Sequence, residues 1–193
     1  MTRWILGTTA AALVAFPMAA EAQRTEVDRA PALSAHAGAA YYNLEGGEGW
    51  APAVAARWSI PFGTVFRAEL GGSVAWPEQT FAVPGNGTVE DSRSLFVAAP
   101  EAMIQMSFGQ GNMAPYIGVG GALTIDRAER QDGSTIGPNV GPSAAAGVRW
   151  IIGDQLGAVA EVRGRAVGPD FDRRMAELTL GLSWSLKPTP YVF

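Results

Sequence analysis

The charged residues of this sequence alternate with uncharged ones, and this alternation limits the folds open to the chain. Eight segments of roughly 10 to 14 residues follow a period of two, the side-chain period of a β-strand. In seven of them one alternate set is free of charge, and the charges fall in the other set. In residues 66–76, for example, Leu70 and Trp76 belong to the uncharged set and Arg67 and Glu69 to the charged one. We therefore expect an all-β protein of eight strands.

The charged set is nearly neutral, which indicates that its members pair with one another. It consists of five arginines and four glutamates: Arg57, Arg67, Glu69, Glu101, Arg149, Glu161, Arg163, Arg165 and Glu177. An arginine exposed to lipid at the bilayer centre costs about 2–4 kcal/mol, so a charge-free face is what a membrane requires. Water imposes no such requirement. We expect the uncharged set to face lipid and the charged set to form an interior network, because an eight-stranded barrel is just wide enough to be filled by side chains.

The connections between the segments alternate in length. Short turns are expected at residues 61–63, 109–113 and 153–155, and longer, mostly polar loops at residues 44–49, 77–92, 126–140 and 168–173. Aromatic residues also gather near the segment ends, as in membrane-interface girdles. Short periplasmic turns and long outer loops are typical of an antiparallel up-and-down transmembrane β-barrel in a bacterial outer membrane.

The N-terminal residues 1–22 have the features of an export signal. Arg3 precedes an apolar run over residues 4–20, and Ala20 and Ala22 form a small-x-small cleavage site. An uncleaved anchor is less favoured because the run is short and contains Pro17. The expected organisation is a signal peptide at 1–22, a short periplasmic segment at 23–32, the barrel at 33–186 and a C-terminal tail at 187–193. The chain has no cysteine for disulfides and no basic tract for binding nucleic acid.

Three stretches resemble the outer-membrane β-barrel domain family, the porin-family barrels similar to OmpA and OmpX. They are Pro115-Tyr116-Ile117-Gly118-Val119-Gly120-Gly121-Ala122, Ala160-Glu161-Val162-Arg163-Gly164-Arg165 and Thr179-Leu180-Gly181-Leu182-Ser183-Trp184-Ser185-Leu186. The resemblance implies that Thr179, Gly181, Trp184, Leu186 and the terminal Phe193 form an assembly signal for the barrel-insertion machinery. The sequence departs from the family pattern at residues 187–190, where two prolines separate Leu186 from Phe193 and cannot continue a paired strand.

No residue pattern indicates a catalytic, cofactor or metal site. His36 is the single histidine and falls on the inner set, where Ser34 and Ser143 are the candidate nucleophiles of a lipid-modifying enzyme, but no acid adjoins it in sequence. The glycines of residues 118–121 lack the lysine and helix of a phosphate loop. Loop carboxylates could bind a divalent cation or cation-bridged lipopolysaccharide, although solvated charge explains them better: Asp126, Glu129, Asp132, Asp170 and Asp172.

These features favour a non-enzymatic outer-membrane barrel with a structural or surface-interaction role. The expected partners are outer-membrane lipid and lipopolysaccharide, the insertion machinery, and a surface ligand bound through residues 77–92 and 126–140. The alternatives are a narrow porin-like channel, a lipid-modifying outer-membrane enzyme and a soluble periplasmic barrel that binds a ligand.

The membrane and soluble alternatives differ in electrophoretic behaviour. We expect the protein to fractionate with the outer membrane and to migrate differently before and after boiling, because a closed barrel keeps its fold in detergent until it is heated. Recovery from the soluble periplasm with no change in mobility on boiling would contradict the membrane prediction.

Overall fold

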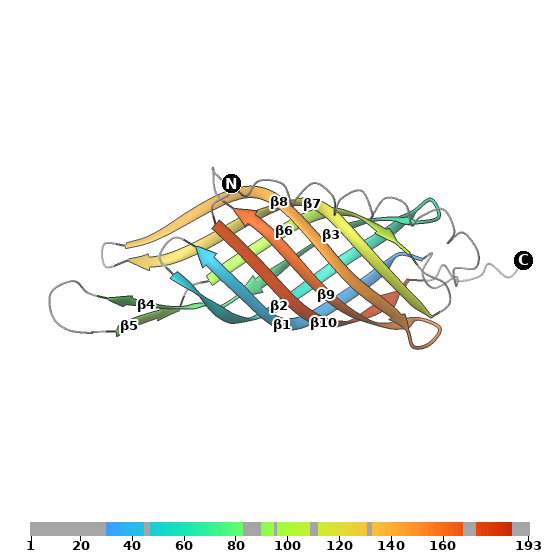
Figure 1. Ribbon diagram of the computed structural model, residues 1–193, viewed down its shortest axis with the longest axis horizontal. Helices are drawn as coiled ribbons and strands as arrows, with labels where there is room; N and C mark the ends of the chain where they lie inside the picture. The colour runs from blue at the N-terminus through green and yellow to red at the C-terminus, as the bar shows by residue number, and fades with distance from the viewer. Residues whose placement is uncertain are drawn as a thin grey trace, which may run out of the picture.

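The computed structural model describes residues 30–44, 47–82, 90–94, 96–108, 112–130, 133–167 and 173–186, which form β-strands and their connections (Figure 1). Eight strands close into an antiparallel barrel: β1 (Ala32–Leu44), β2 (Gly47–Phe62), β3 (Phe66–Ala75), β6 (Phe96–Ser107), β7 (Met113–Arg130), β8 (Gly133–Ile151), β9 (Leu156–Val167) and β10 (Arg173–Ser185). Two more form a separate hairpin: β4 (Glu78–Ala82) and β5 (Glu90–Ser94). The expected eight-stranded fold class is confirmed. Within these ranges, no helix has the length and apolarity needed to cross a membrane.

The barrel closes because its first strand pairs on both sides. β1 pairs with β2 along one edge and with β10 along the other, where the register runs from Ala32 opposite Ser185 to Asn43 opposite Arg174. The remaining barrel strands pair in chain order, except that β3 pairs directly with β6 across the β4–β5 hairpin. No barrel strand is therefore left as an open edge, which matters in lipid because an unpaired backbone group there costs several kcal/mol, of the order of a lost hydrogen bond in hydrocarbon.

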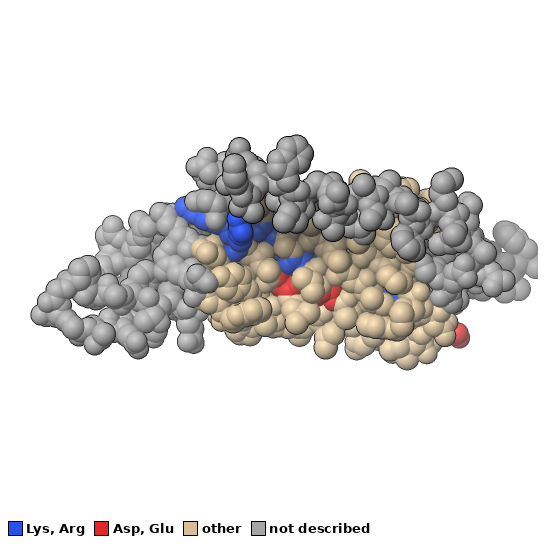
Figure 2. All heavy atoms as spheres, in the orientation of Figure 1, with Lys and Arg blue, Asp and Glu red and all other residues tan. Residues whose placement is uncertain are grey.

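The two faces of the wall differ in the way that the alternation indicated. Leu180 is 68% exposed on the outside, whereas its neighbour Thr179 and Glu177 are each 1% exposed. Most of the described surface in Figure 2 is uncharged, with basic atoms grouped toward the left of the view and a few acidic and basic atoms visible in its middle. Outward aromatic rings pair near both ends of the barrel, with centroids 5.5 Å apart for Tyr41 and Trp50 and 5.8 Å apart for Phe62 and Phe66. These rings lie where aromatic girdles flank a lipid-facing band.

The connections at residues 63–65 and 152–155 lie at one end of the barrel, which we call the turn end (Figure 1, right), whereas residues 109–111 of the third expected turn lie outside the described residues. At the opposite end, the hairpin end, three predicted loops were wrong. β1 extends to Leu44 and β2 begins at Gly47; the stretch expected as a loop at 77–92 contains most of the β4–β5 hairpin; and β7 and β8 extend through most of 126–140. Strand pairing uses backbone hydrogen bonds, so polar side chains beyond the apolar band do not end it.

Two glycines occur where the backbone requires them. Gly63 has a φ of 68° in the turn between β2 and β3, a conformation that other residues rarely adopt. Gly38 lies where β1 approaches β10, and a Cβ atom added there would meet the Leu178 carbonyl oxygen at 2.0 Å. By contrast, a Cβ atom added at Gly164 would have no neighbour within 4 Å.

We expect Gly38→Ala to destabilise the barrel by about 1–3 kcal/mol, because the closing strands must separate to admit a methyl group. The matched control is Gly164→Ala, which adds the same group to open space on β9. Urea unfolding of the refolded proteins measures both changes. Equal midpoints for the two variants would show that β1 and β10 are not held so closely.

Candidate functional site

The interior of the barrel is built around Arg163, which contacts three carboxylates. Its Nε lies 2.9 Å from Glu161 Oε1, its Nη2 lies 2.6 Å from Glu69 Oε1, and its Nη1 donates to Glu101. Arg163 is 1% exposed and Glu161 2% exposed. Each charge is therefore removed from water and compensated by an opposite charge, the condition under which buried ions are tolerated.

A second arginine extends this network toward the hairpin end. Arg165 donates to Glu177 Oε1 at 2.5 Å and to Glu101 Oε1 at 3.1 Å, so Glu101 is shared between the two arginines. Ser73 on β3 donates to the same Glu177 oxygen at 2.5 Å. These contacts connect β3, β6, β9 and β10 across the lumen.

Arg57 connects the network to His36. Its Nη1 lies 2.9 Å from Glu161 Oε1 and 3.1 Å from His36 Nδ1, and His36 Nε2 lies 2.9 Å from Ser34 Oγ. The group next to the Ser34–His36 pair is thus a cation. Among the described residues no carboxylate forms a hydrogen bond with His36, and Ser143 Oγ forms none at all. The geometry lacks the acid that orients the base in a nucleophilic triad.

Two further arginines lie at the turn end. Arg67 donates to Ser59 Oγ at 2.9 Å and to the carbonyl oxygen of Ala30 at 3.0 Å, which ties the start of the described chain to the barrel interior. Arg149 donates to Ser107 Oγ at 3.3 Å and to Gln105, and its guanidinium carbon lies 4.1 Å from the centre of the Tyr116 ring.

An apolar layer lies inside the barrel toward the hairpin end. Its buried members come from β1, β2, β3, β6 and β10 and are Ala40, Tyr42, Ala51, Ala53, Ala75, Val97 and Met175. The sequence analysis did not predict this layer, because it used only the charged residues of the inner set to predict what fills the lumen. The strand parity could have revealed it, since Tyr42, Val97 and Met175 all fall on the inner face.

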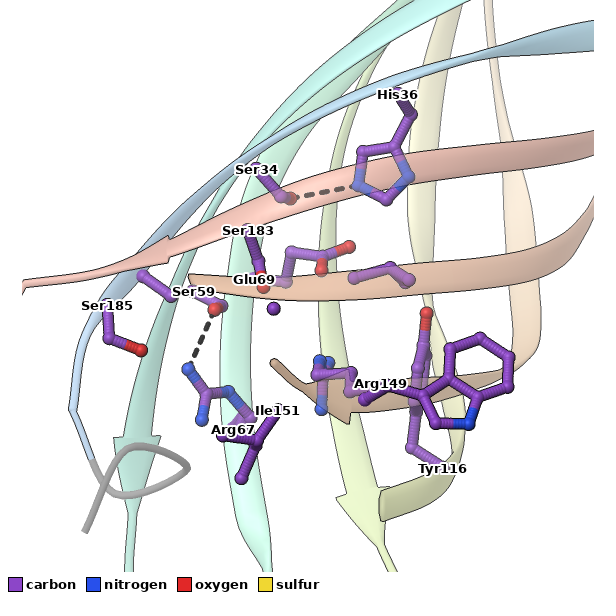
Figure 3. A pocket seen from close by; sticks show the side chains of 14 residues that line it. Ser34, His36, Ser59, Arg67, Glu69, Tyr116, Arg149, Ile151, Ser183 and Ser185 are labelled. Carbon is purple, nitrogen blue, oxygen red and sulfur yellow. Dashed lines mark hydrogen bonds between the residues drawn. The ribbon is translucent and has the colours of Figure 1, made fainter. Parts of the chain in front are cut away.

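The lumen keeps a small cavity near the turn end, lined by residues that include Ser34, His36, Glu69 and Arg149 (Figure 3). The space open to water centres is about 30 Å³, enough for about two or three water molecules. No group of three or more His, Cys, Asp or Glu within the described ranges is placed to hold a metal ion.

The residues predicted as an interior network all lie on the lumen side of the wall. Arg57, Glu69, Glu101, Glu161, Arg163, Arg165 and Glu177 come together through the ion pairs given above, and toward the turn end Arg67 donates to Ser59 and Arg149 to Ser107. Sequence reasoning missed three uncharged partners: Ser73, Gln105 and Tyr116, whose hydroxyl donates to Glu161 Oε2 at 2.6 Å. Their inward parity was the available signal.

Of the expected assembly-signal residues, Thr179, Gly181 and Trp184 lie in β10, and Leu186 follows this strand directly. Trp184 and Leu186 are exposed on the outer face at 55% and 48%. Thr179 is buried, and Gly181 lies opposite His36 in the β1 register. Phe193 and the tail at 187–193 lie outside the described residues, as do the expected signal peptide at 1–22 and Asp132, Asp170 and Asp172.

Solved structures with the same architecture are small bacterial surface barrels. Neisserial surface protein A superimposes with a TM-score of 0.65 at 14% identity, over 81% of this chain and 97% of its own. Ail of Yersinia pestis, in complex with the heparin analogue sucrose octasulfate, gives a TM-score of 0.58 at 9% identity, over 81% and 98%. The outer membrane protein OprG from Pseudomonas aeruginosa gives 0.54 at 11%, over 81% and 97%. This chain has the fold of the small outer-membrane β-barrels.

No protein-family model and no curated protein matches the sequence, so the likeness rests on structure. At these identities it shows the fold, and function has to be argued from the residues of this chain.

Removing one member of the central network should be costly. We expect Glu161→Ala to lower the free energy of unfolding by about 3–5 kcal/mol, because Arg163 loses one of its three carboxylates and Arg57 loses its nearest one. Glu90→Ala in β5, outside the barrel, is the control and should change stability little. Equal urea midpoints for the two variants would contradict the network's role in stability.

Proposed function

We propose that this protein is exported to the bacterial outer membrane, where its barrel is a closed, non-enzymatic scaffold that presents hairpins for surface interactions. The observation that carries the proposal is the filled lumen. The central ion pairs span the interior, and the apolar layer around Tyr42 and Met175 covers them on the hairpin side. A barrel filled in this way offers its surface, rather than a channel, for function.

The uncharged outer wall supports the membrane location. Leu178, Leu180 and Leu182 are 55%, 68% and 46% exposed on one strand, which would be unfavourable in water but is favourable in lipid. The aromatic pairs near both ends fit the two membrane interfaces. The outward Trp184 and Leu186 are available to the barrel-insertion machinery that the family resemblance implies.

The hairpins support the surface role. β4 and β5 pair only with each other in the described structure, and the β7–β8 pairing continues to Arg130 and Gly133, beyond the point where β8 leaves β9 at Ser143. Both hairpins extend from the same end of the barrel (Figure 1, left). Ail, a similar barrel, is the attachment invasion locus protein of Yersinia pestis. We propose lipopolysaccharide and a ligand on a neighbouring surface as the partners of these hairpins.

Single-channel recording in planar bilayers tests the closed scaffold. We expect no conductance steps from the refolded protein, because the paired charges and the apolar layer leave no continuous water path. A general porin inserted under the same conditions is the control for recording, and a heat-dependent mobility shift verifies folding. Regular conductance steps would favour the narrow-channel alternative.

Deletion of the β4–β5 hairpin tests the surface role. We expect a variant that joins Trp76 to Phe96 by a short linker to keep the barrel and its mobility shift, since β3 and β6 already pair directly. It should bind less to purified lipopolysaccharide and to host-cell surfaces than the intact protein. Unchanged binding would remove this hairpin from the proposed function.

A further inference from the structure

The cavity at the turn end contains a cation whose charge is not balanced by a neighbouring carboxylate. Arg149 reaches it from β8, and within the described structure no Asp or Glu lies within ion-pair distance of its guanidinium. The guanidinium contacts neutral groups: Ser107, Gln105 and the Tyr116 ring. A guanidinium carries five N–H donors, so these contacts leave others for a ligand.

The serine hydroxyls of the cavity supply further donors. Ser34 Oγ lies 2.9 Å from His36 Nε2, and Arg57 Nη1 lies 3.1 Å from His36 Nδ1 and 3.2 Å from His36 Nε2. Ser34 and Ser183 both line the cavity, and a serine hydroxyl can donate one hydrogen bond.

Glu69 also lines the cavity, but both oxygens of its carboxylate accept hydrogen bonds from other side chains. One carboxylate oxygen accepts from Arg163 Nη2 at 2.6 Å and the other from Gln105 Nε2 at 2.8 Å. Figure 3 shows Arg149 and Ser34 converging on the cavity from different strands, with Ser183 on a third.

We infer that this cavity is a binding site for one small inorganic anion of about the size of chloride. The juxtaposition of Arg149 with the Ser34 and Ser183 hydroxyls supplies positive charge and neutral donors. The free space, about 30 Å³ for water centres, fits an ion of this size. The bound anion balances the Arg149 charge at the turn end, as carboxylates balance Arg163 and Arg165 in the middle.

Urea unfolding in lipid vesicles tests the site through linkage. Sodium chloride is compared with sodium gluconate, whose anion is too large for the cavity, at equal ionic strength. In the saturating range, each tenfold rise in chloride should raise the ratio of folded to unfolded protein up to tenfold, because one anion binds only the folded barrel. Arg149→Gln should lose this dependence, and the control Arg174→Gln, at an exposed position on β10, should keep it.

Bromide diffraction gives a second measurement that needs no variant. Crystals grown in sodium bromide should show an anomalous peak in the cavity, within contact distance of the Arg149 guanidinium. A cavity that holds water alone would overturn the inference. The same conclusion follows if chloride and gluconate give equal unfolding curves, or if Arg149→Gln responds to chloride as Arg174→Gln does.

Discussion

The backbone pairing of β1 with β10 is the constraint on which the rest of the structure depends. It converts an open sheet into a barrel in which every strand has two neighbours, so the wall can lie in lipid without unpaired backbone groups. Closure with eight strands also fixes a narrow lumen. Charged side chains that point inward therefore meet one another, and Arg163 finds three carboxylates within reach.

The lumen is organised in layers along the barrel axis. Arg67 and Arg149 lie at the turn end beside a small cavity, the ion pairs occupy the middle, and the apolar cluster lies toward the hairpin end. A buried ion pair contributes little to stability relative to an apolar core, because desolvation offsets the attraction. The ion pairs lie inside this barrel because the alternation of the strands places the charged residues on the lumen side, which keeps charge off the lipid face. The hairpins do not have to keep charge off a lipid face, so their side chains can be adapted to a ligand.

The sequence predicts the barrel wall well and the lumen only in part. The alternation along each strand places Arg57, Glu161 and Glu177 inside the barrel, because shifting a strand by one residue would expose its charged side chains to lipid. It does not say which arginine meets which glutamate, since partners such as Glu101 and Arg163 are 62 residues apart and meet only after closure. The loops around residues 126–140 were misjudged because polar composition ends the membrane band but does not end strand pairing.

Site-directed spin labelling of β10 tests most directly which residues face lipid and which face the lumen. Because the chain has no cysteine, a single label can be placed at each chosen position. With one cysteine in turn at residues 178, 179, 180 and 182, collision with lipid-soluble oxygen should be high at the three leucine positions and low at Thr179. Low access to a water-soluble nickel reagent is expected at all four. High oxygen access at 179, with low access at 178 and 180, would contradict the assignment of the two faces.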